Sequence, residues 1–327
     1  MTDGSQLATI IYMSYTPSNL IDAVRYFADT KVCNDYMRSI KWPDGLACCH
    51  KCGSTAVYEL STRPILKCRD CKKQFSYKVG TIFEDSPLGL DKWFPAVWAI
   101  ANCKNGISSH ELGRALGVTQ KTAWFMLHRI REAMRTGTFQ KLAGAIESDE
   151  TFIGGEARNM HAHKRERKIR GRGSVGKRIV HGLLQRGGDV RAKVVDSTER
   201  AELHPIIISN VSKGSNLYTD SALSYETLDK YFLHEAINHA EEYVRGEVHT
   251  NGLENFWSLF KRMLKGTYVS VAPFHLQRYV DEEVCRYNAR KGKDGDRFAA
   301  AMSRVVGRRV TWRQLTAQDG CGFMGLQ

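Results

Sequence analysis

The spacing of hydrophobic residues changes near residue 144 and divides the chain into two parts. In the first part, apolar residues recur at helical intervals in 91–103 and 120–134, which we predict to be helices. Between them, Ser108 or Ser109 can cap a short helix that ends at Leu116. The first part of the chain is therefore predicted to be mainly helical.

After residue 144 the apolar runs become short or alternate with polar residues, as in β-strands. We predict strands at 145–155, 177–186 and 189–197, a helix at 199–211, a strand at 215–221, a helix at 224–232, a strand at 235–240, and helices at about 250–264 and 273–290. Pro205 indicates that the helix at 199–211 starts late or is kinked. The order of these elements is that of a ribonuclease H-like α/β domain.

Charge and composition restrict the class of protein. The chain has 327 residues and a formal net charge of +13, which favours a polyanionic partner such as nucleic acid. We find no apolar run of about 18 residues, so we expect no membrane span. The first twenty residues have no basic segment ahead of their apolar stretch, so we expect no secretory signal and a cytoplasmic, nucleoid-associated protein.

Four of the nine cysteines form two CxxC pairs, Cys49 with Cys52 and Cys68 with Cys71. Each pair can direct two thiolates at one ion, and two such pairs complete a tetrahedral structural Zn²⁺ site. Cys48 competes with Cys49 by position, but the CxxC spacing favours Cys49. The sequence therefore predicts a zinc ribbon in a reducing compartment rather than a set of disulfides.

The two helices on either side of Gly117 form a second candidate module. A helix, a glycine-containing turn and a second helix are typical of the helix-turn-helix motif, whose second helix enters the major groove of DNA. Thr119 is placed to cap this second helix. Thr119, Gln120 and Lys121 are its leading residues and our candidate DNA contacts. An ordinary pair of packed helices is the alternative interpretation.

Three acidic residues carry the candidate chemistry. Asp149 and Asp220 close short apolar runs, so we expect them at the ends of neighbouring strands, and Glu254 lies in an amphipathic helix. Carboxylates that converge in this way can hold two Mg²⁺ or Mn²⁺ ions, which support cleavage and joining of phosphodiesters. Lys261 follows Glu254 by seven residues, on the same helical face, and can hold a phosphate.

Residues close to these three acids receive structural interpretations. Glu147 and Glu150 flank Asp149, and we expect both to point to the opposite face of the strand. Thr250 or Asn251 is expected to cap the helix that carries Glu254. His249 can contact DNA or water, or can serve in capping or packing. Three aromatic residues in that helix are expected in the core: Phe256, Trp257 and Phe260.

A glycine-rich, strongly basic segment at 154–178 follows the first strand. We expect it to be mobile in the free protein and to become ordered on a phosphate backbone. A solvated loop with no fixed contact is the alternative. The candidate DNA contacts in this segment are Lys164, Arg165, Arg167, Lys168, Arg170 and Arg172.

Several motifs together resemble one family. They are WPDGLACCHKCGS, VGTIFEDS, GVTQKTAWFMLHRIREAM, ESDETFIGG and HTNGLENFWSLFKR followed by GTY. With them the chain resembles the DDE-type transposases of bacterial insertion sequences, in the ISXO2-like group that has an N-terminal zinc ribbon and is related to eukaryotic Merlin elements. The resemblance extends over nearly the whole chain, to about residue 290.

The resemblance implies a ribonuclease H-like fold and metal-dependent DNA strand cleavage and transfer at the element's terminal inverted repeats. Asp149 and Asp220 match the first and second aspartates of the family. Its third position is either Glu or Asn, followed by Lys. The seven-residue spacing from Glu254 to Lys261 is typical of such sites and favours Glu254, and Asn251 is the alternative. The family also implies double-stranded DNA as partner and at least a homodimer on paired DNA ends.

The combined prediction is an α/β catalytic domain preceded by a small zinc ribbon and a helical helix-turn-helix domain. The predicted boundaries are 18–80 for the N-terminal helix and zinc ribbon, 81–140 for the helix-turn-helix, 141–295 for the catalytic domain and 296–327 for a C-terminal tail. A DNA-binding regulator derived from a transposase and a purely hydrolytic DNA nuclease are the alternative functions. The regulator would be expected to lose a carboxylate, and all three are present.

Overall fold

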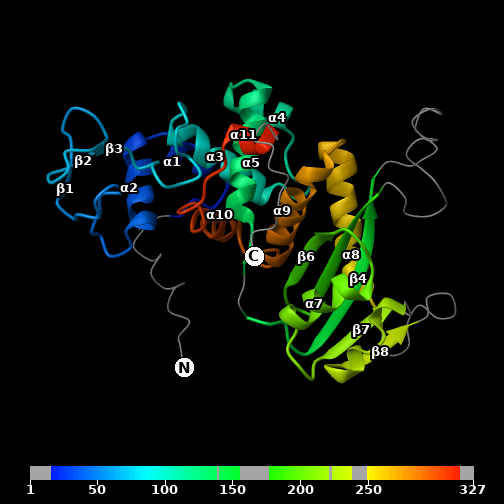
Figure 1. Cartoon of the computed structure of the whole chain (residues 1–327). Coiled ribbons are helices and arrows are strands. Elements are labelled where there is room, and N and C mark those ends of the chain that lie inside the picture. The colour runs from blue at the N-terminus through cyan, green and yellow to red at the C-terminus, as the bar shows by residue number, and fades with distance from the viewer. Residues whose placement is uncertain (1–15, 138–139, 155–176, 221–222, 238–248, 317–327) are drawn as a thin grey trace. The chain divides into compact units, whose positions relative to one another are not determined.

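A computed structural model describes residues 16–137, 140–154, 177–220, 223–237 and 249–316 (Figure 1). The chain forms two compact units, one within Met1–Arg135 and Lys291–Gln327 and the other within Thr136–Arg290. Within the described ranges, no helix combines the length and the apolar character needed to cross a membrane.

The first unit is mainly helical, as predicted. Its three short strands form an antiparallel sheet in the order β1-β2-β3, comprising β1 (Val57–Glu59), β2 (Leu66–Cys68) and β3 (Gln74–Phe75). The helices are α1 (Leu20–Tyr26), α2 (Thr30–Lys41), α3 (Leu90–Asn102), α4 (Ser109–Leu116), α5 (Gln120–Met134), α10 (Asp294–Met302) and α11 (Trp312–Thr316). The predicted bounds of α3, α4 and α5 are confirmed to within one residue.

Local sequence signals set the ends of α4 and α5. Ser108 caps α4 and forms a capping box with Glu111, in which each side chain accepts a hydrogen bond from the other residue's backbone N–H. Gly117 ends α4 in the left-handed region at φ 63°, where glycine has no steric cost. Thr119 caps α5 by accepting from the N–H of Thr122. The two helices are therefore defined by their own sequence.

Aromatic side chains from both ends of the sequence form the core of the first unit. The ring of Phe298 in α10 lies 5.3 Å from that of Phe27, 5.4 Å from that of Trp98 and 6.2 Å from that of Phe94. Arg297 adds a 2.8 Å hydrogen bond to the side chain of Asn102. Helix α10, most of which the sequence suggested was part of a tail, thus packs on α3, while Trp312 of α11 contacts Trp124 and Phe125 of α5.

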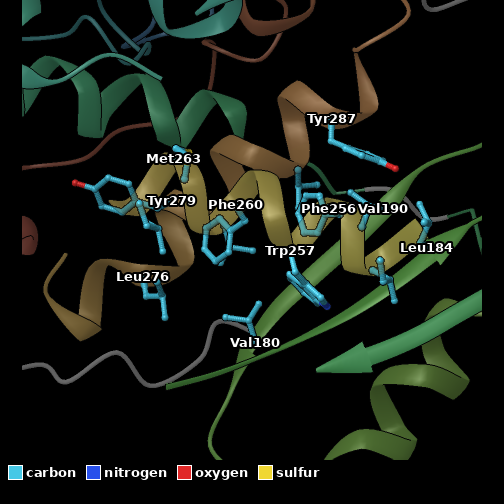
Figure 2. Close-up of a cluster of buried hydrophobic side chains, with 14 residues drawn as sticks. Val180, Leu184, Val190, Phe256, Trp257, Phe260, Met263, Leu276, Tyr279 and Tyr287 are labelled. Carbon is cyan, nitrogen blue, oxygen red and sulfur yellow. The ribbon is translucent and has the colours of Figure 1, made fainter. Parts of the chain in front are cut away.

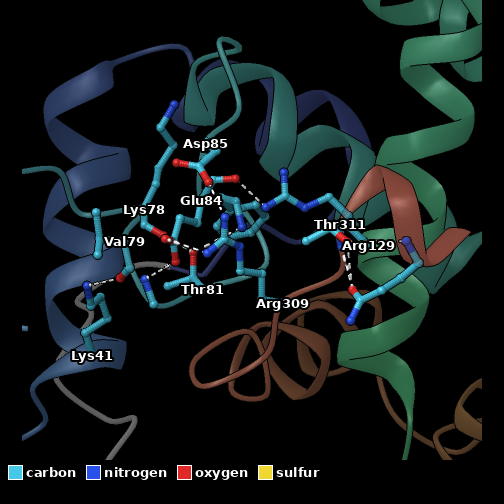
Figure 3. Close-up of polar contacts among 12 residues, drawn as sticks. Lys41, Lys78, Val79, Thr81, Glu84, Asp85, Arg129, Arg309 and Thr311 are labelled. Atoms are coloured by element: carbon cyan, nitrogen blue, oxygen red, sulfur yellow. Dashed lines mark hydrogen bonds and ion pairs between the residues drawn. The ribbon is translucent and has the colours of Figure 1, made fainter. Parts of the chain in front are cut away.

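Polar contacts hold the segment 78–86 in the first unit (Figure 3). Arg309 pairs with the carboxylates of Glu84 and Asp85, while Arg129 of α5 donates to the backbone carbonyl of Glu84. Lys41 of α2 donates to the carbonyl of Val79 at 2.6 Å. The segment is therefore tied to α2, to α5 and to the C-terminal part of the chain.

The second unit is a mixed α/β layer structure. Its five strands lie in the order β6-β5-β4-β7-β8, with β5 antiparallel to both of its neighbours and β4, β7 and β8 parallel to one another. The elements are β4 (Ala145–Ile153), β5 (Arg178–Gln185), β6 (Val190–Val195), α7 (Arg200–Asn210), β7 (Asn216–Asp220), β8 (Leu233–Ile237), α8 (Asn251–Met263) and α9 (Leu276–Asn288).

Two predictions in this unit were wrong in detail. Helix α7 begins at Arg200 and contains Pro205, so of the two alternatives that Pro205 suggested, the late start is wrong. The helix predicted at 224–232 is replaced by two 3-10 turns, Leu223–Tyr225 and Leu228–Lys230. Thr227 between them has φ 73°, and a left-handed residue interrupts the right-handed α-helix.

Helices cover the two faces of the sheet. On one face, α8 and α9 pack on β5 and β6, and the buried side chains include Val180, Leu184 and Val190 (Figure 2). On the other face, α7 and the 3-10 turns pack on side chains such as Ile146, Leu183 and Leu217. Neighbouring residues of a strand thus point into different cores, as the two-residue period of a strand requires.

His181 of β5 makes the stability of this unit sensitive to pH. Burial lowers the pKa of the imidazole to about 4 from the ordinary 6.5. Nε2 lies 3.0 Å from Ser148 Oγ, whereas Nδ1 has no hydrogen-bond partner within the described parts of the chain. The cation would have to donate from both nitrogens, so the folded protein favours neutral His181.

We therefore expect the second unit to lose stability as the pH falls from about 6.5 to 4. The unfolded chain binds the proton first, so the free energy of unfolding falls by roughly 3 kcal/mol across this window. His181→Gln removes the titration and should make the decrease shallower. Hydrogen exchange of β5 peptides, corrected for intrinsic rates, measures this; equal pH slopes in wild type and variant would contradict it.

Candidate active site and metal centre

The parallel pairing of β4 with β7 brings two of the candidate acids together. Glu147 and Tyr218 form the last pair of this parallel ladder, and Asp149 and Asp220 each lie two residues beyond it on adjacent strands. Asp220 ends β7, as predicted, but Asp149 lies in the middle of β4. The expectation that both stand at strand ends was wrong for Asp149, because β4 continues to pair with β5 beyond it.

Asp149 is half-buried, and Trp257, Asp220 and Glu254 all affect the pKa of its carboxyl group. Its pKa is raised to about 6, chiefly by burial and in addition by the charges of Asp220 and Glu254, while hydrogen bonds from the Trp257 side chain and the Glu150 backbone oppose the increase. Trp257 Nε1 donates to Asp149 Oδ2 at 3.0 Å. The structure therefore places Asp220 and Glu254 both within electrostatic reach of Asp149.

The angular positions along α8 distinguish Glu254 from Asn251. At about 100° per residue, Glu254 lies about 60° around the helix from Trp257, whereas Asn251 lies about 120° away. Glu254 is therefore closer to the side of α8 that meets Asp149. Lys261 lies about 20° from Glu254 on the same side, and Glu254, Lys261 and Asn251 are all exposed.

Glu147 belongs to the same face of β4 as Asp149, and the expectation that it points away was wrong. Two residues separate them, so the strand period places both toward α8. Glu147 Oε2 accepts a 2.9 Å hydrogen bond from the backbone N–H of Leu253. Its Oε1 lies 2.9 Å from Nε of Arg186. Sequence reasoning missed this residue, although the strand period was a signal for it.

Glu150 points to the opposite face of β4, as predicted. It accepts a hydrogen bond from Tyr225, and Ser148 connects Tyr225 to His181 at 3.3 and 3.0 Å. Burial raises the pKa of Glu150 to about 7; the Tyr225 hydroxyl opposes this, while Asp149 and Asp220 add to it. This side of the strand holds a buried polar chain that is separate from the side facing α8.

The four CxxC cysteines form one cluster in the first unit. The sulfur atoms of Cys49, Cys52, Cys68 and Cys71 all lie within 4.8 Å of one another. Burial disfavours ionisation of Cys49, but hydrogen bonds from the backbone N–H groups of Cys52 and Lys51 lower its pKa to about 7. Four sulfur donors in this arrangement match the donor set of a closed zinc site, so the predicted ligands fit the ion.

The candidate DNA contacts of α5 are exposed at its start. Thr119 is used as the helix cap, and Gln120 donates a 2.8 Å hydrogen bond to Ser109 Oγ. The Lys121 ammonium lies 4.7 Å from the ring centre of Trp312 in α11. The sequence did not predict this contact, because nearly two hundred residues separate its partners.

The basic segment contributes no geometry to the site, because 155–176 lies outside the described residues. This range holds all six of its candidate DNA contacts, namely Lys164, Arg165, Arg167, Lys168, Arg170 and Arg172.

Two family models match the chain. Residues 141–288 match the ISXO2-like transposase domain, and residues 29–74 match the transposase zinc-ribbon domain. The first match contains Asp149, Asp220 and Glu254, and the second contains the four clustered cysteines. The matches thus coincide with the two sites described above.

Two curated proteins are similar in sequence. An uncharacterized protein in transposable element ISH50 of Halobacterium salinarum is 27% identical over 254 residues, which cover 74% of this chain and 85% of that protein. An uncharacterized transposase-like protein of Haemophilus influenzae is 35% identical over 96 residues, covering 29% of this chain and 77% of the relative.

Among solved structures, the crystal structure of the Mos1 strand transfer complex contains a similar chain with 14% identity and a TM-score of 0.29. The match covers 70% of this chain and 78% of that one. A TM-score this low says nothing about the fold of the present protein.

The two family models and the Haemophilus influenzae relative agree with each other, and the chain belongs to the ISXO2-like family of DNA transposases.

Proposed function

We propose that the second unit cleaves and joins DNA strands at the ends of an insertion sequence, with Asp149, Asp220 and Glu254 as its catalytic carboxylates. The proposal rests chiefly on the convergence of these acids where β4, β7 and α8 meet. The strand order β6-β5-β4-β7-β8, with the first strand of the unit in the middle, supports a ribonuclease H-like fold.

The three carboxylates fit two Mg²⁺ or Mn²⁺ ions, which prefer oxygen ligands and need few protein groups. When bound, such ions activate a water or a DNA 3′-hydroxyl and stabilise the leaving oxygen. The Trp257 N–H leaves one oxygen of Asp149 free of this hydrogen bond and fixes the orientation of the carboxylate. Lys261, on the Glu254 side of α8, contacts a phosphate of the DNA end.

The first unit recognises the terminal inverted repeats in this proposal. The start of α5 presents exposed Thr119, Gln120 and Lys121 to the major groove, as in a helix-turn-helix. The zinc ribbon holds its strands by a structural Zn²⁺ ion and adds a second contact surface. The basic segment at 154–178 binds the phosphate backbone through counterion release. Synapsis of two ends requires a homodimer or a larger assembly on nucleoid DNA.

Replacing either aspartate tests the catalytic assignment. Asp149→Asn and Asp220→Asn should lower strand transfer at least about a hundredfold, since metal ligation supplies several kcal/mol of transition-state stabilisation. The assay uses Mg²⁺ and DNA that carries the inverted repeats flanking the gene. Asp196→Asn is the control, because this carboxylate is 88% exposed in the same unit and should leave activity intact. Active Asn variants would refute the assignment.

A second comparison decides the third carboxylate. We expect Glu254→Gln to abolish strand transfer and Asn251→Ala to change it less than about tenfold, because Glu254 lies nearer to the Asp149 side of α8. Both side chains are exposed, so neither change should unfold the protein, and circular dichroism verifies this. Full activity in Glu254→Gln, with loss in Asn251→Ala, would transfer the role to Asn251.

The zinc ribbon can be tested by metal content. Cys68→Ser should reduce bound zinc well below the expected value of about one ion per chain and weaken binding to inverted-repeat DNA, because metal binding folds such modules. Cys48→Ser is the matched control: Cys48 accepts a hydrogen bond from Trp42 and stands outside the cluster. Atomic absorption gives the zinc content, and loss of zinc in Cys48→Ser would contradict the ligand set.

A further inference from the structure

Helix α8, which carries Glu254, receives its N-terminal cap from another element. Thr250 occupies the N-cap position, yet its side chain forms no capping hydrogen bond. Instead, Glu147 of β4 accepts from the N–H of Leu253, the third residue of the helix, at 2.9 Å. The expectation that Thr250 or Asn251 caps the helix through its side chain was therefore wrong. A carboxylate at this position satisfies a free backbone donor and suits the positive end of the helix dipole.

Glu147 is deeply buried and is held in place by Arg186. Only 1% of its side chain is exposed. Arg186 donates from Nε to Glu147 and from Nη2 to the carbonyl of His249 at 2.9 Å. The guanidinium also lies 4.4 Å from the ring centre of Tyr218 in β7. Arg186, which follows β5, thus connects β4 and β7 with His249, just before the start of α8.

Glycine permits the short distance between the carboxylate and the helix. A Cβ atom added to Gly252 would lie 2.7 Å from Glu147 Oε2 and 2.5 Å from Leu184 Cδ2. On the sheet side, a Cβ added to Gly182 would lie 2.6 Å from the ring of Trp257. A side chain at either position would therefore force the facing side chains, or α8 itself, to shift.

Two hydrogen bonds fix α8 along β4. Glu147 binds Leu253, and Asp149 binds Trp257. The strand partners are two residues apart, which is about 6.8 Å, and the helix partners are four residues apart, which is about 6.0 Å. These similar spacings let both hydrogen bonds form at the same time. Glu254 is the residue that follows Leu253 in the helix. Figure 2 shows Trp257 extending from α8 toward the strands.

We propose that Glu147, paired with Arg186, is the positioning residue that fixes α8 on β4 and thereby sets Glu254 against Asp149. This inference rests on the proposed function of the three carboxylates. We do not assign Glu147 as a metal ligand, because its side chain is only 1% exposed and its two oxygens accept from Arg186 and Leu253. It acts on the metal site through the placement of the helix.

Glu147→Gln tests the proposal with little change in shape. Two oxygens accept hydrogen bonds in the wild type, whereas a glutamine side chain offers one oxygen and one NH₂ group, so either Leu253 or Arg186 loses its acceptor. Isothermal titration with Mn²⁺ measures binding without DNA or turnover. We expect the dissociation constant to rise roughly tenfold or more, as is usual when a supporting group behind metal ligands is lost. Strand transfer should need correspondingly more Mn²⁺.

Glu283→Gln is the matched control. Glu283 is also a buried carboxylate paired with an arginine, Arg286, at 2.6 Å, but it lies on α9. Its loss should lower the melting temperature without changing Mn²⁺ affinity beyond about twofold. An equal loss of affinity in both variants would show a general effect of stability and would overturn the proposal. Unchanged affinity in Glu147→Gln would overturn it as well.

Gly252→Ala provides an independent route should Glu147→Gln fold poorly. Alanine favours a helix over glycine, but its Cβ would overlap Glu147 and Leu184. A role in stability alone therefore predicts a lower melting temperature with normal Mn²⁺ binding by the folded protein. Our proposal instead predicts weaker Mn²⁺ binding, because the added Cβ displaces the Glu147 carboxylate. Normal binding in Gly252→Ala would contradict it. Asp149→Asn distinguishes failure of the positioning role from failure of the proposed function. If that variant kept Mn²⁺ binding and strand transfer, the proposed function itself would be wrong.

Discussion

The close approach of α8 to β4 and β5 is the constraint on which the candidate site depends. Gly182 and Gly252 leave no Cβ at two points where a side chain would overlap groups of the facing element. Buried apolar side chains such as Phe256 and Phe260 supply the attraction across this contact. Hydrophobic packing alone tolerates sliding, however, and the two carboxylate hydrogen bonds from β4 add the directionality that fixes the position of the helix along the strand.

The alternation of β4 separates two sets of polar groups that are adjacent in sequence. Glu147 and Asp149 face α8, whereas Ser148 and Glu150 face Tyr225 on the other side. Four consecutive polar residues in the middle of a sheet would be costly if their groups were not paired. Here each side has its own partners, so the strand can bring carboxylates into the interior of the unit.

Local signals in the sequence were sufficient for helices such as α3, α4 and α5 and for the cluster of four cysteines, but not for α10, α11 or the two 3-10 turns of the second unit. Ser108, Gly117 and Thr119 define helix ends through neighbours a few residues away, and the CxxC spacing is itself local. The roles of Glu147 and Trp312 depend on partners roughly a hundred or more residues distant, and no periodicity encodes such a pairing. The break at Thr227 was missed because its left-handed backbone is imposed by the packing of the turns on the sheet.

The electrostatics of the candidate site explain why positioning matters there more than elsewhere in the fold. Burial and the charges of Asp220 and Glu254 all oppose ionisation of Asp149, so bringing the three acids together is unfavourable in the protein alone. Mutual repulsion would tend to move Glu254 on its helix away from the sheet. Arg186 neutralises the neighbouring Glu147 and ties it to the start of α8, which lets the helix stay in place against this repulsion. The carboxylates of Asp149, Asp220 and Glu254, held close together in this way, suit a divalent cation. Binding of the cation would relieve the repulsion between them.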